Sequence, residues 1–149
     1  MQNKLLRRPS GGYCYEHNLL FATLLERLGY RVRRLAARVQ PDKPGPRTHM
    51  LLIVEADGEE WLADVGFGAA LLEPIPFSDG AISHQGGWTY GLQRREGGVW
   101  LLRSWNPDGW SDLYAFTTEP QRPIDYVVYN HYTGESYGSC HQPQSKLTL

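Results

Sequence analysis

The Asp57-Gly58 dipeptide constrains the fold of this chain most, because it stands between two apolar runs, at 48–56 and 59–68. Asp-Gly is typical of a two-residue β-hairpin turn, in which both residues adopt positive φ angles. Such a turn pairs Ala56 with Glu59. Every further pair then lies one residue farther from the turn on each strand, which sets the register of the whole hairpin.

This register predicts that an imidazole and a carboxylate meet. His49 falls opposite Gly66, and Asp64 lies one diagonal away on the face that His49 occupies. Diagonal neighbours are about 7–8 Å apart at the backbone, within reach of long side chains. A longer or bulged loop would shift the register by one residue and turn the two side chains away from each other.

The rest of the pattern predicts two helices and several more strands. Leucines at steps of three and four residues predict a helix over 15–28 that ends at Gly29. Further elements are a strand over 30–39, strands over 88–94, 99–105 and 113–116, a short helix over 123–132, and an irregular tail from Thr133. This order indicates an α+β fold, with a short helical segment packed on an antiparallel β-barrel or sheet.

Composition narrows the class of protein. A chain of 149 residues with a net charge of -1 is about one domain, with no general attraction for nucleic acid or membranes. No apolar run could span a bilayer, and the first residues lack the apolar core of a signal peptide. Two cysteines, Cys14 and Cys140, form no disulfide framework, so we expect a cytoplasmic location and free thiols.

Cys14 stands after Gly11-Gly12 and before the predicted helix. A helix N-terminus favours the thiolate, which is the nucleophilic form of cysteine. With His49 as base and Asp64 as its orienting group, the set follows the logic of a nucleophilic triad. Each residue alone has an ordinary structural interpretation: a buried thiol, a strand histidine or a strand-end carboxylate.

A metal site at Glu16 and His17 is not expected, because no second cluster has ligand spacing. We expect Cys140, in the polar tail, to have no part in the site.

Three sequence blocks resemble the signatures of arylamine N-acetyltransferases: GGYCYEHN at 11–18, THM at 48–50 and DVGFG at 64–68. The segment FTTEPQ at 116–121, followed by Asp125 and Asn130, is also similar. The resemblance implies a papain-like triad, with 1–29 as the remnant of an N-terminal helical domain and 30–149 as a β-barrel domain. The C-terminal lid domain of the family is expected to be absent, and Ser10 stands where the family usually has arginine.

The resemblance also implies an activity. Cys14 would take an acetyl group from acetyl-CoA, a co-substrate that is not permanently bound, and pass it to an arylamine or arylhydrazine. His49 would move the protons and Asp64 would fix the imidazole tautomer. The substrate-binding residues would be Phe67, Gly68 and Tyr15.

Two other functions stay open at this point. Relatives that resemble this family close amide bonds on bulky polyketide thioesters with the same triad. Alternatively, the chain is a non-catalytic remnant that binds a partner or an aromatic ligand. Apolar surface left by missing domains would favour a homo-oligomer.

Overall fold

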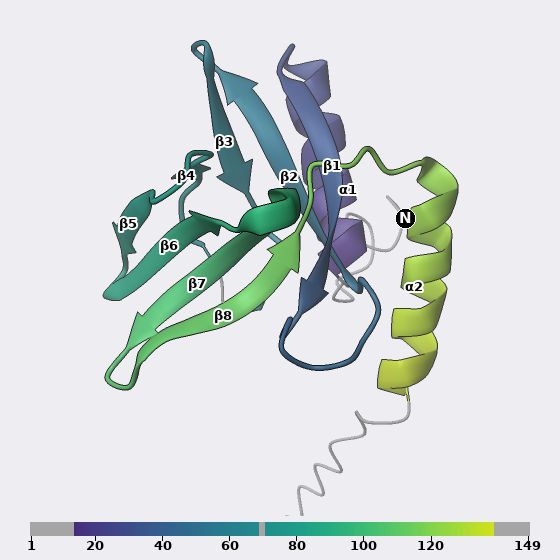
Figure 1. Ribbon diagram of the computed structural model, residues 1–149. Helices are drawn as coiled ribbons and strands as arrows, with labels where there is room; N and C mark the ends of the chain where they lie inside the picture. The colour runs from purple at the N-terminus through teal and green to yellow at the C-terminus, as the bar shows by residue number, and fades with distance from the viewer. Residues whose placement is uncertain (1–13, 69–70, 139–149) are drawn as a thin grey trace, which may run out of the picture.

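The computed structural model describes residues 14–68 and 71–138 (Figure 1). Its elements are α1 (Cys14–Arg27), β1 (Arg31–Val39), β2 (His49–Ala56), β3 (Glu59–Ala63), β4 (Ile75–Pro76), β5 (Ile82–Gln85), β6 (Trp88–Arg94), η2 (Glu96–Gly98), β7 (Trp100–Asn106), β8 (Gly109–Phe116) and α2 (Pro123–Gly138). One antiparallel sheet has the strand order β4-β3-β2-β1-β8-β7-β6-β5. Helix α1 lies along β1 and β2, and α2 follows β8 (Figure 1). The α+β prediction is confirmed.

The central hairpin has the predicted turn and register. Asp57 and Gly58 have φ angles of 53° and 80°, as a type I′ turn requires. The pairs run from Ala56↔Glu59 to Leu52↔Ala63. The ladder ends there, before it reaches His49, and the chain beyond it runs against the first turn of α1.

Strand β2 is buried on both faces over most of its length, and β1 over 35–37, which explains why β2 reads as a continuous apolar run. Side chains that point to one face of the sheet, including those of Leu35 and Leu51, belong to the main core that the curved sheet encloses. Side chains that point to the opposite face, including that of Leu52, belong to a second cluster that contains Ala22 of α1. The apolar face of α1 is therefore what fixes the helix to the sheet.

A buried glutamine joins the two edges of the sheet. Gln85 on β5 is 3% exposed, and its Oε1 accepts hydrogen bonds from Leu72 N and Glu73 N at 2.8 and 3.0 Å. Its Nε2 donates to Glu73 O at 2.8 Å. These backbone groups lie just before β4, so one amide side chain satisfies them where no ladder partner is present.

Three details differ from the sequence-based predictions. Strands β4 and β5 were not predicted, and β8 begins at Gly109 rather than at 113. Helix α2 continues to Gly138, so the irregular tail from Thr133 is wrong for 133–138. Short or proline-containing strands have too little alternation to be recognised. Ser10, the Gly11-Gly12 pair and Cys140 lie outside the described residues.

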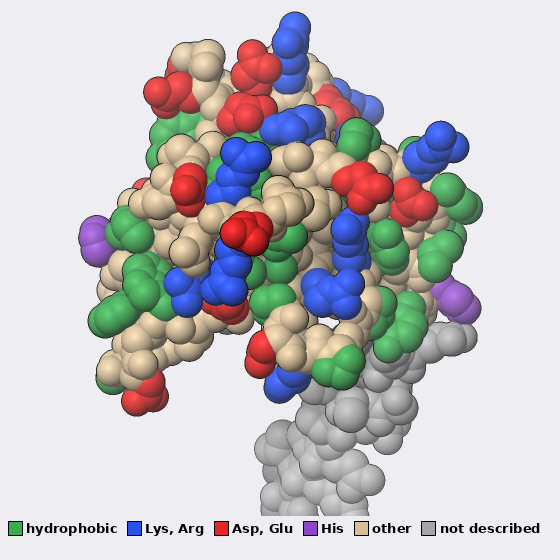
Figure 2. All heavy atoms as spheres, viewed as in Figure 1, with side chains coloured by type: hydrophobic (Ala, Val, Ile, Leu, Met, Phe, Trp, Pro, Cys, Tyr) green, Lys and Arg blue, Asp and Glu red, His purple; other side chains and the backbone are tan. Residues whose placement is uncertain are grey.

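The surface mixes charges and contains one apolar stripe. Basic and acidic side chains are interspersed on the face in Figure 2. Among the described residues, Arg34 and Glu26 form an ion pair at 2.7 Å. Helix α2 exposes four apolar side chains at helical spacing, each 50–62% exposed: Ile124, Val127, Val128 and Tyr132. Self-association through apolar surface, which the sequence led us to expect, stays a prediction. In the described part of the chain, no helix has the length and apolarity to cross a membrane.

Candidate active site

The first turn of α1 brings Cys14 to the strand that carries His49. Cys14 is the first residue of α1, and its Sγ donates to Thr48 O at 3.6 Å. Cys14 also lies close enough to the imidazole to contribute to raising the pKa of His49. The candidate nucleophile and the candidate base are therefore in contact, although 34 residues separate Cys14 from Thr48 along the chain.

His49 and Asp64 form a buried pair. The His49 side chain is 2% exposed, and its Nε2 lies 2.6 Å from Asp64 Oδ2. Because the carboxylate occupies Nε2, the nitrogen left for Cys14 is Nδ1. The meeting of imidazole and carboxylate that the hairpin register predicts is confirmed as geometry.

This contact controls the charge of both groups. Burial by itself lowers the pKa of His49, but the Asp64 carboxylate outweighs it, and together with Cys14 it raises that pKa to about 9. Burial by itself raises the pKa of Asp64, but the charge of His49 and several hydrogen bonds hold it below its usual range. At neutral pH the pair is therefore an ionised carboxylate beside a positively charged imidazolium.

Five donors surround the Asp64 carboxylate. Oδ1 accepts hydrogen bonds from Asn18 Nδ2 at 2.9 Å, Gly66 N at 3.0 Å and Phe67 N at 3.2 Å. Oδ2 accepts from His49 Nε2 at 2.6 Å and Tyr114 Oη at 3.0 Å. Burial raises the pKa of Tyr114, so its hydroxyl stays protonated and able to donate. The carboxylate is thus held from both oxygens.

Two of these donors had no predicted role. Asn18 lies four residues after Cys14, so both face the same side of α1, and this spacing could have indicated a shared site. Tyr114 is fully buried on β8 and reaches Asp64 only because β8 pairs with β1. No local pattern in the sequence indicates that contact.

The predicted substrate-binding residues lie in different places. The Phe67 ring packs edge-on against His49, with centroids 5.0 Å apart, and against Tyr114 at 5.2 Å. Gly68 is exposed in the turn that follows. Tyr15 is 4% exposed and turns away from this aromatic group, to pack on Tyr126 with centroids 6.2 Å apart.

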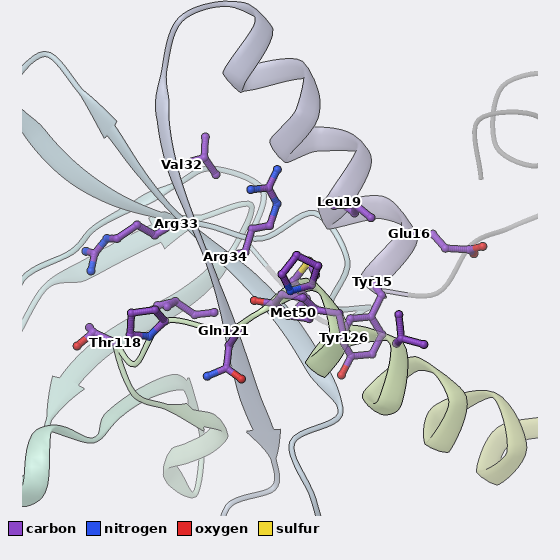
Figure 3. Close-up of a pocket in the computed structure, with 14 residues that line it drawn as sticks. Tyr15, Glu16, Leu19, Val32, Arg33, Arg34, Met50, Thr118, Gln121 and Tyr126 are labelled. Atoms are coloured by element: carbon purple, nitrogen blue, oxygen red, sulfur yellow. The ribbon is translucent and has the colours of Figure 1, made fainter.

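Tyr15 lines a separate cavity of about 750 Å³ between α1, β1 and α2 (Figure 3). Met50, which follows His49, lines it as well. Because side chains alternate along β2, Met50 points to the face opposite His49. The cavity therefore lies behind the Cys14–His49 pair and not in front of it. Burial raises the pKa of both Tyr15 and Tyr126.

Residues 14–68 and 71–138 contain no group of three histidine, cysteine or acidic side chains that could hold a metal ion. The reactive groups that the described residues bring together are the thiol of Cys14, the imidazole of His49 and the carboxylate of Asp64.

Comparisons with known proteins show the family to which the chain belongs. The N-acetyltransferase family matches residues 1–149. An arylamine N-acetyltransferase / N-hydroxyarylamine O-acetyltransferase of Salmonella typhimurium is 36% identical over 149 residues, covering 97% of this chain and 50% of the relative. An arylamine N-acetyltransferase of Mycobacterium tuberculosis is 41% identical over 155 residues, covering 99% of this chain and 52% of the relative.

The solved structure of Mycobacterium marinum arylamine N-acetyltransferase in complex with CoA has a TM-score of 0.81 and 37% identity, and the match covers 97% of this chain and 54% of that one. The chain spans about half the length of the curated relatives it matches. The matches and the site geometry together show that this chain belongs to the N-acetyltransferase family.

Proposed function

We propose that this chain carries the catalytic triad of an arylamine N-acetyltransferase. In this proposal Cys14 is the nucleophile, His49 is the general base and Asp64 orients the imidazole. The observation that carries it is the buried 2.6 Å contact between His49 Nε2 and Asp64 Oδ2, on a ring whose pKa the neighbouring Cys14 also raises. A base held in one tautomer against a nucleophile is the arrangement that covalent catalysis requires.

The first half-reaction transfers the acetyl group to the protein. The proton of the Cys14 thiol rests on His49 Nδ1, as the raised pKa of the imidazole favours, and the Sγ thiolate attacks the thioester carbonyl of acetyl-CoA. The tetrahedral intermediate then expels the CoA thiolate, which receives the proton from His49. The products are an acetyl thioester on Cys14 and free CoA.

The second half-reaction transfers the acetyl group to the acceptor. The nitrogen of an arylamine or arylhydrazine attacks the thioester carbonyl while His49 accepts a proton from that nitrogen. Collapse of the intermediate releases the N-acetylated product, and the proton returns to Sγ. Backbone N–H groups near Cys14 would stabilise the oxyanion in both halves. Asp64 keeps its charge throughout and exchanges no proton.

The acceptor pocket is proposed to include Phe67 and Gly68. Phe67 packs against His49, so its partly exposed ring is the aromatic surface closest to the imidazole. Tyr15 follows Cys14 directly, but its ring lines the cavity behind the pair, so its contact with substrate stays a prediction. A reducing compartment such as the cytoplasm would keep Cys14 as the free thiol that this chemistry needs.

Intact-mass spectrometry tests the assignment of the nucleophile. After addition of acetyl-CoA we expect the mass of one acetyl group on the wild-type chain and on a Cys140→Ala control. Cys14→Ala should gain no acetyl group and should transfer none to an arylamine. An acetyl adduct that persists on Cys14→Ala would contradict the proposal.

No observation favours the two other functions over acetyl transfer. A polyketide amide synthase would use the same three residues, so the acyl donor distinguishes it: rapid acetylation from acetyl-CoA supports the proposed function. A non-catalytic remnant would leave Cys14 no more reactive toward an alkylating reagent than a free cysteine at neutral pH.

A further inference from the structure

The Asn18 side chain joins the three segments that carry the triad. It is fully buried and lies one helical turn after Cys14 on α1. Its Nδ2 donates to Met50 O on β2 at 2.6 Å and to Asp64 Oδ1 at 2.9 Å. Its Oδ1 accepts from Val65 N at 3.1 Å. An amide has two N–H groups and one oxygen, and all are used here in the one orientation that matches donors to acceptors.

The contact that this amide bridges is close. A Cβ placed on Gly66 would lie 2.7 Å from Asn18 Nδ2, 2.7 Å from Cys14 O and 2.8 Å from Cys14 Cα. The turn at 64–66 is therefore seated directly on the first turn of α1, where no side chain could intervene. At this point polar bonds, and not apolar packing, hold the helix to the turn.

An apolar residue would be the simpler choice for this position. A buried amide costs free energy unless every polar atom is satisfied, and a leucine has a higher helix propensity. The amide, however, gives what a leucine cannot: a donor to an ionised carboxylate. That hydrogen bond is one of those that keep the pKa of Asp64 below its usual range.

We propose that Asn18 is a positioning residue of the acetyl-transfer site, an inference that rests on the proposed function. It holds the first turn of α1 against β2 and the 64–66 turn, so that Cys14 stays beside the start of β2, where His49 lies, while Asp64 stays ionised. Asn18 itself contacts neither the sulfur nor the imidazole in the hydrogen bonds described, so it acts through Asp64 and the helix.

Alkylation of Cys14 by iodoacetamide, followed over about pH 5 to 9, separates positioning from stability. All variants carry Cys140→Ala, so that Cys14 is the one thiol. Asn18→Leu should lower the alkylation rate at neutral pH by about tenfold or more, because the hydrogen bond that it removes goes to a charged group, and such bonds are about twice as strong as neutral ones. Thr23→Val is the matched control, because its hydroxyl bonds Leu19 O elsewhere on the same helix.

Asn18→Asp provides a second, shape-matched test. It keeps the acceptor for Val65 N but places a carboxyl beside Asp64. Two adjacent carboxylates do not both ionise readily, so in acid the new carboxyl retains a proton and can donate to Asp64. Its alkylation rate relative to wild type should therefore recover as the pH falls, and that of Asn18→Leu should not.

The outcomes divide as follows. If Asn18→Leu is less stable to urea yet keeps the wild-type alkylation profile, the role is structural only and the inference is wrong. If Asn18→Leu does not fold, Asn18→Asp decides, and a rate ratio that does not change with pH contradicts positioning. If wild-type Cys14 reacts no faster than free cysteine and takes no acetyl group, the proposed function fails and the inference about Asn18 fails with it.

Discussion

Replacing Asp64 with asparagine should reverse which nitrogen of His49 carries its proton. The volume is unchanged, and the side-chain oxygen must stay where three N–H groups meet at Oδ1, including those of Asn18 and Gly66. The new NH₂ group then faces His49 Nε2, where the carboxylate oxygen was. Since both cannot donate, Nε2 becomes the acceptor and the proton moves to Nδ1.

This reversal disables the base. With its proton on Nδ1, the ring offers a donor to Cys14 and cannot take the proton of the thiol. A tautomer reversal of this kind in a Ser-His-Asp site lowers kcat by about four orders of magnitude. We expect a loss of similar size in acetyl transfer by the variant, with the fold retained.

The energetic consequence follows from the pKa of His49. That pKa is about 9 with Asp64 present, against an ordinary value of 6.5. At 1.36 kcal/mol per pKa unit, the carboxylate stabilises the imidazolium by about 3 kcal/mol net of burial. In Asp64→Asn burial remains and the negative charge is gone, so the pKa should fall below 6.5.

The sign of the pH dependence should therefore reverse. In the wild type, the raised pKa contributes stability that is complete below about 6.5 and is lost as the pH rises through about 9. In Asp64→Asn the lowered pKa contributes stability that is present above 6.5 and is lost as the pH falls. Urea unfolding at several pH values measures both slopes.

NMR titration of ¹⁵N-labelled protein measures the tautomer and the pKa directly, and a His49→Gln variant assigns the His49 signals among the five histidines. The reasoning is refuted if His49 in Asp64→Asn still titrates above its ordinary value with the proton on Nε2. It is equally refuted if the variant transfers acetyl groups at the wild-type rate.

Three further substitutions test the packing around the site. Tyr114→Phe removes the hydroxyl that donates to Asp64 Oδ2 at 3.0 Å. In urea unfolding at neutral pH it should lower the free energy of unfolding by about 1.5–3 kcal/mol, and by less as the pH falls through the lowered pKa of Asp64. An equal loss at all pH values would contradict this. Gly66→Ala places a methyl group against Cys14, so it should lower the free energy of unfolding by about 1–3 kcal/mol and slow acetylation. Gly45→Ala is the control, because no atom lies within 4 Å of its Cβ, and it should do neither. Equal behaviour of the two variants would count against the close approach. Leu52→Ala should cost about 2–5 kcal/mol by emptying the contact of β2 with α1, and a loss under 1 kcal/mol would contradict that packing.

The contact between His49 and Asp64 could be predicted because a hairpin is a local structure. Asp57-Gly58 selects the turn, the turn sets the register, and the register determines which side chains share a face. Only fifteen residues separate the imidazole from the carboxylate. Local physical chemistry is sufficient over that distance.

The contacts of Tyr114 and Gln85 could not be predicted, for the converse reason. Tyr114 reaches Asp64 from 50 residues away, because the sheet places β8 beside β1. Gln85 bonds backbone groups twelve and thirteen residues away, at the junction of two edges that exists only in the folded sheet. Such contacts depend on the strand order, and no periodicity along the chain determines it.

The five donors around Asp64 also determine where the mobile proton of the site can be. A carboxylate that accepts from both oxygens in a buried environment gains more from remaining ionised than from taking a proton, so it cannot store one during the reaction. In the proposed reaction the proton must then move between Sγ of Cys14 and Nδ1 of His49. Its transfer depends on the position of the helix relative to the strand, which the hairpin register does not set. The contacts of Asn18 and the bare Cα of Gly66 set it instead, and the site therefore needs both the local and the long-range constraint.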